Sequence, residues 1–151
     1  MTYSEAKRSY TPALAVDLYR RLCRSRAFMD ENYSLPLDLD EISAQANLST
    51  YHFLRLFRMT FKKTPHRYLV ERRIEKAREL LASTEMRVTD VCFEVGFESL
   101  GSFSTLFRKC VGRSPVEYRG QQVERNSSPL ARIPGCFRSV YAGAPLSLRQ
   151  L

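Results

Sequence analysis

The amino-acid sequence predicts an all-α fold in which a long linker helix joins two helix-turn-helix subdomains. Three observations predict it: a repeat at an offset of fifty residues, apolar residues at helical spacing, and cap residues before the expected helices. Each copy of the repeat holds a short helix, a tight turn and a second helix, which is the outline of a helix-turn-helix. The repeated residues include Phe53, Leu56, Phe57, Arg58, Pro65 and Tyr68, which recur as Phe103, Leu106, Phe107, Arg108, Pro115 and Tyr118.

The first expected element is a helix that begins at Pro12, after a flexible polar lead of residues 1–11. Leu18 and Leu22 are spaced so that both face inward from this helix. The proline-containing stretch S-L-P-L at 34–37 ends it, because proline cannot continue a helix.

A capping-box signature opens the second helix, since Asp38 is followed three residues later by Glu41. A turn follows, and Ser49 then caps a helix over about 50–61. Together with the helix from Pro12, these elements form a first helix-turn-helix unit over about residues 12–64.

The linker helix is predicted over residues 65–83, because Thr64 is a good cap and Pro65 suits the first helical position. The second unit follows over about 84–119 with the same order of elements. Residues 120–151 are expected to form a loop-rich tail, because N-S-S-P, I-P-G and A-G-A-P punctuate this stretch.

The charge of the chain points to a polyanionic partner, although a solvated basic surface gives the same total. The 151 residues carry a formal net charge of +8 and have a pI near 9.6. Most of the excess lies between Tyr51 and Arg73, where seven basic residues face the single acidic Glu71, a net of +6. The seven are Arg55, Arg58, Lys62, Lys63, Arg67, Arg72 and Arg73.

Cysteines and histidines give no pattern for catalysis or metal binding. The four cysteines lack metal-ligand spacing, and Cys92 and Cys110 fall in apolar helical patterns where core positions are expected. His52 and His66 have no partner pattern for a nucleophile or a metal. We therefore expect no enzymatic activity, no metal and no cofactor. The chain also lacks a signal peptide and an apolar run of about 18 residues, so a cytoplasmic, nucleoid location is expected.

Winding residues 50–61 at about 100° each separates a core face from an exposed face. Arg55 lies at the centre of the exposed face, where its guanidinium has the geometry for a bidentate contact with guanine in the major groove. Tyr51 and Leu54 flank it and are suited to thymine methyls or sugars. Arg58 lies on the same face, whereas the opposite face carries Phe53, Leu56, Phe57 and Thr60.

The matching helix of the second unit offers smaller side chains. Gly101, Ser104 and Thr105 form its exposed face with Arg108, and Leu100 lies at the edge. Such residues approach a groove closely but make few bidentate contacts. The first helix is therefore expected to supply most of the discrimination between DNA sequences.

Residues from about 37 to 119 resemble the tandem helix-turn-helix domain of the AraC/XylS family of bacterial transcription regulators. The matching stretches are L-D-E-I-S-A-Q-A-N-L-S, F-L-R-L-F-R-M-T-F, R-I-E-K-A-R-E-L-L, V-G-F-E-S and F-S-T-L-F-R-K-C-V-G-R-S-P-V-E-Y-R. The resemblance implies two recognition helices in successive major-groove segments on one side of double-stranded DNA. Carried over by position, the base-contacting residues are Tyr51, Leu54, Arg55, Leu100, Gly101, Ser104 and Thr105.

Phosphate contacts, which fix register without reading sequence, are expected from the basic residues and one serine. They are Ser49, Arg58, Lys62, Lys63, Arg67, Arg72, Arg73, Arg108 and Arg113. The chain departs from the family at Lys62, where glycine is usual, and at Thr105, where a longer, often basic side chain is common.

The resemblance further implies a regulator of the stand-alone type, since only 37 residues precede the matching region and a sensing domain needs more. Such proteins bind asymmetric sites as monomers. We expect a transcription activator that contacts RNA polymerase beside a promoter. The alternatives are a repressor, or a protein–protein interaction module of the same fold that sequesters another regulator.

Overall fold

The computed structural model describes residues 12–127, and within them every regular element is an α-helix. This confirms the all-α prediction. The tail beyond residue 127 and the lead of residues 1–11 lie outside the described residues. The helices are α1 (Pro12–Glu31), α2 (Leu39–Ala44), α3 (Thr50–Phe61), α4 (Pro65–Ser83), α5 (Val88–Glu94), α6 (Leu100–Val111) and α7 (Pro115–Ser127).

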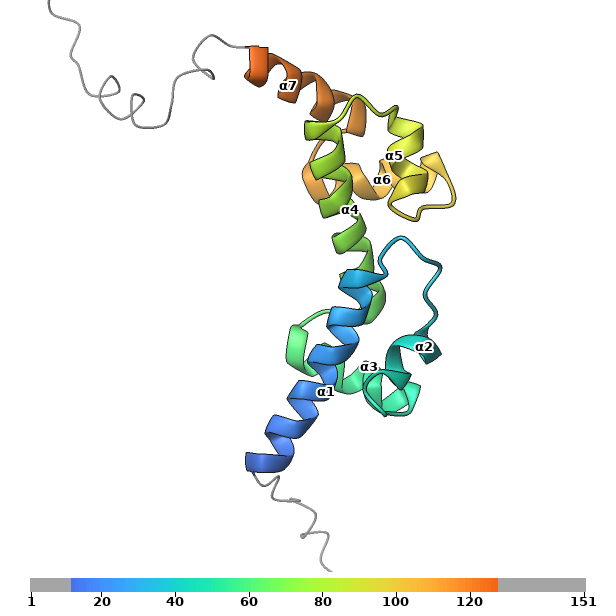
Figure 1. The fold of residues 1–151 in the computed structure, drawn as a ribbon, viewed down its shortest axis with the longest axis vertical. Coiled ribbons are helices and arrows are strands. Elements are labelled where there is room, and N and C mark those ends of the chain that lie inside the picture. The colour runs from blue at the N-terminus through green and yellow to red at the C-terminus, as the bar shows by residue number, and fades with distance from the viewer. Residues whose placement is uncertain (1–11, 128–151) are drawn as a thin grey trace, which may run out of the picture.

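The linker helix α4 runs along the long axis of the molecule, and the other helices gather around its two halves (Figure 1). Helices α1 and α3 pack against the first half, with α2 packed on α1 and α3, and α5, α6 and α7 pack against the second half. Both units therefore use part of α4 as their own helix.

Each unit has its own apolar core, built on a pair of phenylalanines from the second helix of its helix-turn-helix. Phe53 and Phe57 of α3 are fully buried, and so are Phe103 and Phe107 of α6. α4 contributes to both cores, with Leu69 in the first and a run of residues in the second. That run is Val70, Ile74, Ala77 and Leu81.

The same aromatic contact closes both cores. The Tyr68 ring meets Phe57 edge-on with ring centroids 6.0 Å apart, and Tyr118 meets Phe107 edge-on at 5.7 Å. In the first unit the Tyr68 hydroxyl also donates a hydrogen bond of 2.8 Å to Asp30 of α1. Burial, together with this bond, raises the pKa of Tyr68 to about 12. The phenol therefore stays protonated and ties α4 to α1 at any physiological pH.

Both helix-turn-helix turns require a positive φ. Asn47 has φ 50° in the first turn, and Gly96 has φ 88° in the second. The second turn also approaches the first unit closely, because a Cβ at Gly96 would lie 2.5 Å from the carbonyl oxygen of Ser34. Glycine is therefore required there both by the backbone conformation and by the contact between the units.

The predicted caps are confirmed. Asp38 and Glu41 exchange the two hydrogen bonds of a capping box, with Glu41 N–H donating to Asp38 over 2.7 Å. Ser114 and Glu117 form an equivalent box before α7. Thr64 caps α4, and Pro65 occupies its first turn. These local signals explain why helix starts are predictable from the sequence.

Three expectations from the sequence are wrong. Residues 120–127 were expected in the loop-rich tail but are helical. Gly120 is the only glycine or proline between Pro115 and the Ser-Ser-Pro at 127–129, and a single glycine costs only about 1 kcal/mol. Thr60 and Cys110 were expected to face inward but are exposed. They are equivalent positions of the repeat, in the last turn of their helices, where nothing in the described residues covers them.

Leu56, which was expected in the core, and its repeat counterpart Leu106 are half-buried against the two cores. Cys92 is buried, as predicted, and burial raises the pKa of its thiol.

Candidate nucleic-acid interface

Helix α3 is held by its buried side, which leaves the Arg55 side open. The Ser49 hydroxyl caps its first turn by accepting from His52 N–H. The rings of Phe53 and Phe57 pack with centroids 5.3 Å apart. Because successive residues are about 100° apart around the helix, these anchors direct Arg55 away from the core.

The exposed face of α3 combines a cation with unusually exposed apolar side chains. Tyr51 is 74% exposed, Leu54 38% and Met59 60%. They border a hollow of about 580 Å³ together with Arg55 and Arg58, and Thr64 completes its lining. A guanidinium among apolar groups in a concave surface suits a guanine beside a thymine methyl. The structure therefore brings together the three predicted base-contacting residues of α3.

Met59 was missed by the sequence reasoning. It follows Arg55 by four residues, which places it about 40° away around the helix. That spacing was the signal that could have identified it.

Lys62 ends α3 in the left-handed conformation, with φ 58° and ψ 17°. Its counterpart in the second unit is Gly112, with φ 84°. The turn therefore accepts a side chain where the related turn has none. Lys62 is exposed, and like Arg55 and Arg58 it has no acidic side chain within ion-pair distance among residues 12–127.

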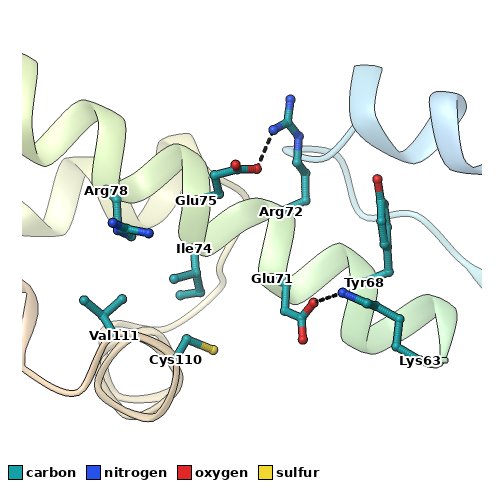
Figure 2. A pocket seen from close by; sticks show the side chains of 9 residues that line it. All are labelled: Lys63, Tyr68, Glu71, Arg72, Ile74, Glu75, Arg78, Cys110 and Val111. Carbon is teal, nitrogen blue, oxygen red and sulfur yellow. Dashed lines mark hydrogen bonds and ion pairs between the residues drawn. The ribbon is translucent and has the colours of Figure 1, made fainter. Parts of the chain in front are cut away.

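Two of the predicted phosphate ligands share one carboxylate. Lys63 donates to Glu71, and the Nε of Arg67 lies 2.9 Å from the other oxygen of that carboxylate. Figure 2 shows Lys63 reaching back to Glu71 beside a hollow between α4 and α6. The Lys63 hydrogen bond, with that of Arg67, lowers the pKa of Glu71 below its ordinary value. Glu71 thus engages two of the side chains that the sequence assigned to phosphates.

Arg72 and Arg73 are engaged within the fold. Arg72 donates to Glu75 over 2.6 Å, as Figure 2 shows, and its Nε lies 3.4 Å from Asp30. Arg73 donates to the backbone carbonyls of Tyr33 and Leu35, at 2.6 and 2.8 Å.

Burial lowers the pKa of the Arg73 guanidinium from its very high ordinary value, but it remains a cation. Arg72 therefore ties α4 to α1, and Arg73 braces the loop between α1 and α2. Both side chains are therefore engaged within the described part of the fold, unlike those of Arg58 and Lys62.

Helix α6 is held in the same way as α3. Ser99 caps it by accepting from Ser102 N–H over 3.2 Å. The Phe103 ring packs between Phe97 and Phe107, with centroids 5.3 and 5.6 Å away. Equivalent anchors place equivalent faces outward in both units.

The exposed face of α6 carries smaller side chains than that of α3. Leu100 is 41% exposed, Gly101 and Thr105 are exposed, and Ser104 is half-buried. Arg108 is exposed, and its guanidinium lies 4.0 Å from Glu117. Arg113 is half-buried in the turn that follows. Of these residues, only Arg108 carries a long side chain on the face that matches the Arg55 face of α3.

Within residues 12–127, no cluster of histidine, cysteine and carboxylate side chains is arranged to hold a metal ion. Among the helices of the same residues, none combines the length and apolar character of a membrane span.

The model of the helix-turn-helix domain family matches residues 42–121. The regulatory protein SoxS of Escherichia coli is 31% identical over 93 residues, which cover 62% of this chain and 87% of that protein. The chain belongs to the AraC family of transcription regulators.

Longer regulators match as well. GbdR of Pseudomonas aeruginosa is 34% identical over 106 residues, which cover 70% of this chain. The transcriptional activator RhaS of Klebsiella pneumoniae is 35% identical over 99 residues, which cover 66% of it. The chain spans 27% of the length of GbdR and 36% of that of RhaS.

Solved structures show the same fold. The DNA-binding domain of AdpA, crystallised with a target DNA, matches with a TM-score of 0.67 and 28% identity, over 72% of this chain and 98% of that one. The C-terminal domain of AraT, a response regulator from Geobacillus stearothermophilus, matches with a TM-score of 0.65 and 30% identity, over 69% and 87%. The family and the fold thus agree with the expectation from the sequence.

Proposed function

We propose that this transcription regulator binds one asymmetric site on double-stranded DNA, with α3 and α6 in successive major-groove segments. The observation that carries the proposal is the repeated presentation of an exposed helix face by two equivalent scaffolds. A major groove admits an α-helix, and its base edges distinguish all four base pairs.

We propose that Arg55 makes the main base-specific contact with DNA. Arg55 has no acidic partner among the side chains that the structure describes, and exposed apolar side chains lie on both sides of it around the hollow. Truncation to alanine is expected to cost about 1–3 kcal/mol on the specific site and to relax preference at one base pair. Thr105 is the matched control, since it stands fifty residues later at the same place on α6 and carries one short hydroxyl.

The phosphate contacts proposed are those of the cations left unpaired in the fold, with Arg58 and Lys62 first among them. These two alone predict a slope of log K against log salt of about −1.8, and each further phosphate ligand adds about −0.9. Lys63, Arg67 and Arg108 contribute only if DNA displaces their carboxylate partners.

The test begins with selection of bound genomic fragments by the purified chain. Mobility shifts on the selected and a scrambled site then compare Arg55→Ala with Thr105→Ala at one salt concentration. The proposal requires a larger loss of specificity from Arg55→Ala. An absence of salt-dependent binding to any fragment would instead favour the protein–protein interaction module.

We further propose that the chain activates transcription beside promoters by contacting RNA polymerase, and that it does so as a monomer. The similarity to RhaS, which is named an activator, supports activation. A reporter fused to a selected promoter should rise when the chain is expressed, whereas a fall would indicate repression. Sedimentation of the chain alone and on its site should give one copy in each case.

A further inference from the structure

A groove lies between the two helix-turn-helix units. Two adjoining hollows, of about 730 and 550 Å³, share three lining residues, and these form its floor: His66 and Val70 of α4 and Leu106 of α6. Ser102 and Lys109 of α6 form the wall on the side of the second unit. We call this surface the inter-unit groove.

The inter-unit groove borders the proposed DNA-binding face of α6. Ser102 and Lys109 lie about 60° and 40° around the helix from Thr105, on the side that faces the first half of α4. His66 is the second residue of α4, and only residues 62–64 separate α4 from the end of α3. The groove therefore borders α6 and lies at the first turns of α4, which follow the end of α3 closely in the chain.

The charges that face the groove are mixed, with a small positive excess. Arg67, Arg73 and Lys109 line it, together with the carboxylates of Glu71 and Glu98.

Glu71 is already held by Arg67 and Lys63, and Arg73 is held by backbone carbonyls. Lys109 therefore remains as a cation without an ion-pair partner among residues 12–127. His66 is exposed on the floor of the groove, at the N-terminal turn of α4, where backbone N–H groups favour an anion.

We propose that the inter-unit groove receives the DNA backbone that borders the minor groove between the two major-groove segments, and that His66 binds a phosphate there. The proposal rests on the proposed function, because two helices in successive segments leave one minor groove facing the protein between them. Lys109 and Ser102 are placed to contact the same strand. Binding then takes up a proton, so DNA affinity rises as pH falls.

The size of the effect follows from the chemistry of imidazole. Only the imidazolium form of a histidine carries charge, and free histidine side chains in water lose it at about pH 6.5. If the phosphate prefers the imidazolium about tenfold, binding is about sevenfold tighter at about pH 5.5 than at about pH 8. The chain offers a matched control, since its other histidine, His52, lies outside the groove in the first turn of α3.

The experiment measures the dissociation constant of the full chain for a selected site by fluorescence anisotropy, at both pH values and constant salt. The wild type and His52→Gln should bind about sevenfold tighter at the lower pH. His66→Gln should lose most of this difference while it still binds the site at about pH 8. Pronounced pH dependence that persists in His66→Gln overturns the proposal.

A second arm uses the wild-type protein and so does not depend on how the variant folds. Neutral methylphosphonates replace phosphates between the two protected major-groove segments, or phosphates outside them. Replacement between the segments should abolish the pH dependence, and replacement outside should preserve it. The reverse pattern overturns the inference but leaves the proposed function standing. No site-specific binding at either pH would overturn the proposed function itself.

Discussion

Replacing Lys62 with glycine is expected to stabilise the fold and to weaken DNA binding at the same time. Lys62 has φ 58° and ψ 17°, the left-handed conformation that a Cβ disfavours by about 1–2 kcal/mol. Glycine removes this strain but loses about 0.5–1 kcal/mol more backbone entropy on folding. The net gain in the free energy of unfolding is therefore about 0.5–1 kcal/mol, which raises Tm by about 2–6 °C.

The loss of the Lys62 ammonium acts in the opposite direction on DNA. A phosphate ligand carries no sequence information, so affinity should fall equally on a specific and a scrambled site. The slope of log K against log salt should become less steep by about 0.9.

Lys62→Ala separates the two effects, because it removes the charge and keeps the strained Cβ. Thermal unfolding and salt titrations of the three proteins form the assay. Equal Tm values for Lys62→Gly and Lys62→Ala would refute the strain argument. An unchanged salt slope in both variants would refute the phosphate contact.

Three further substitutions, of which Gly112→Ala is a control, test contacts within the fold. Gly96→Ala should destabilise the fold by about 2–5 kcal/mol, because the left-handed conformation and a Cβ at 2.5 Å from the Ser34 carbonyl oxygen both oppose it. Gly112→Ala, with φ 84° and nothing within 4 Å of its Cβ, should cost only about 1–2 kcal/mol, and equal costs in denaturant titrations would exclude the clash. Glu71 has a lowered pKa in the fold, so it stabilises the protein above the ordinary glutamate pKa and this contribution is lost as pH falls through the lowered value. Glu71→Gln should therefore reduce the loss of stability between about pH 5 and about pH 3. It should also tighten DNA binding, because it releases Lys63 and Arg67. The same loss of stability in acid for wild type and variant would contradict the stabilising role of Glu71.

Much of the fold was predictable because its signals are local. The capping box of Asp38 and Glu41 and the caps at Ser49 and Thr64 depend on residues a few positions apart. The repeat strengthened the prediction of the core, because the pair Phe53 and Phe57 in the first unit recurs as Phe103 and Phe107 in the second. The face around Arg55 followed from helical spacing alone.

The long-range contacts were not predictable in this way. Arg73 donates hydrogen bonds to the carbonyls of Tyr33 and Leu35, about forty residues earlier, and no local sequence pattern predicts these contacts. A charge count therefore overestimated the basic surface offered to DNA. Similarly, helical winding gives the direction of Cys110 but not whether a neighbouring element covers it.

The central claim is that two recognition helices enter successive major-groove segments of one site. Methylation interference on a selected site tests it most directly, because methyl groups on guanine N7 lie in the major groove. We predict two patches of interference about one helical turn, or roughly 10 base pairs, apart on one face of the duplex, with no inverted repeat. Arg55→Ala should remove interference at one guanine in the patch read by α3 and leave the other patch unchanged. A single patch, or two patches related by a palindrome, would contradict the account.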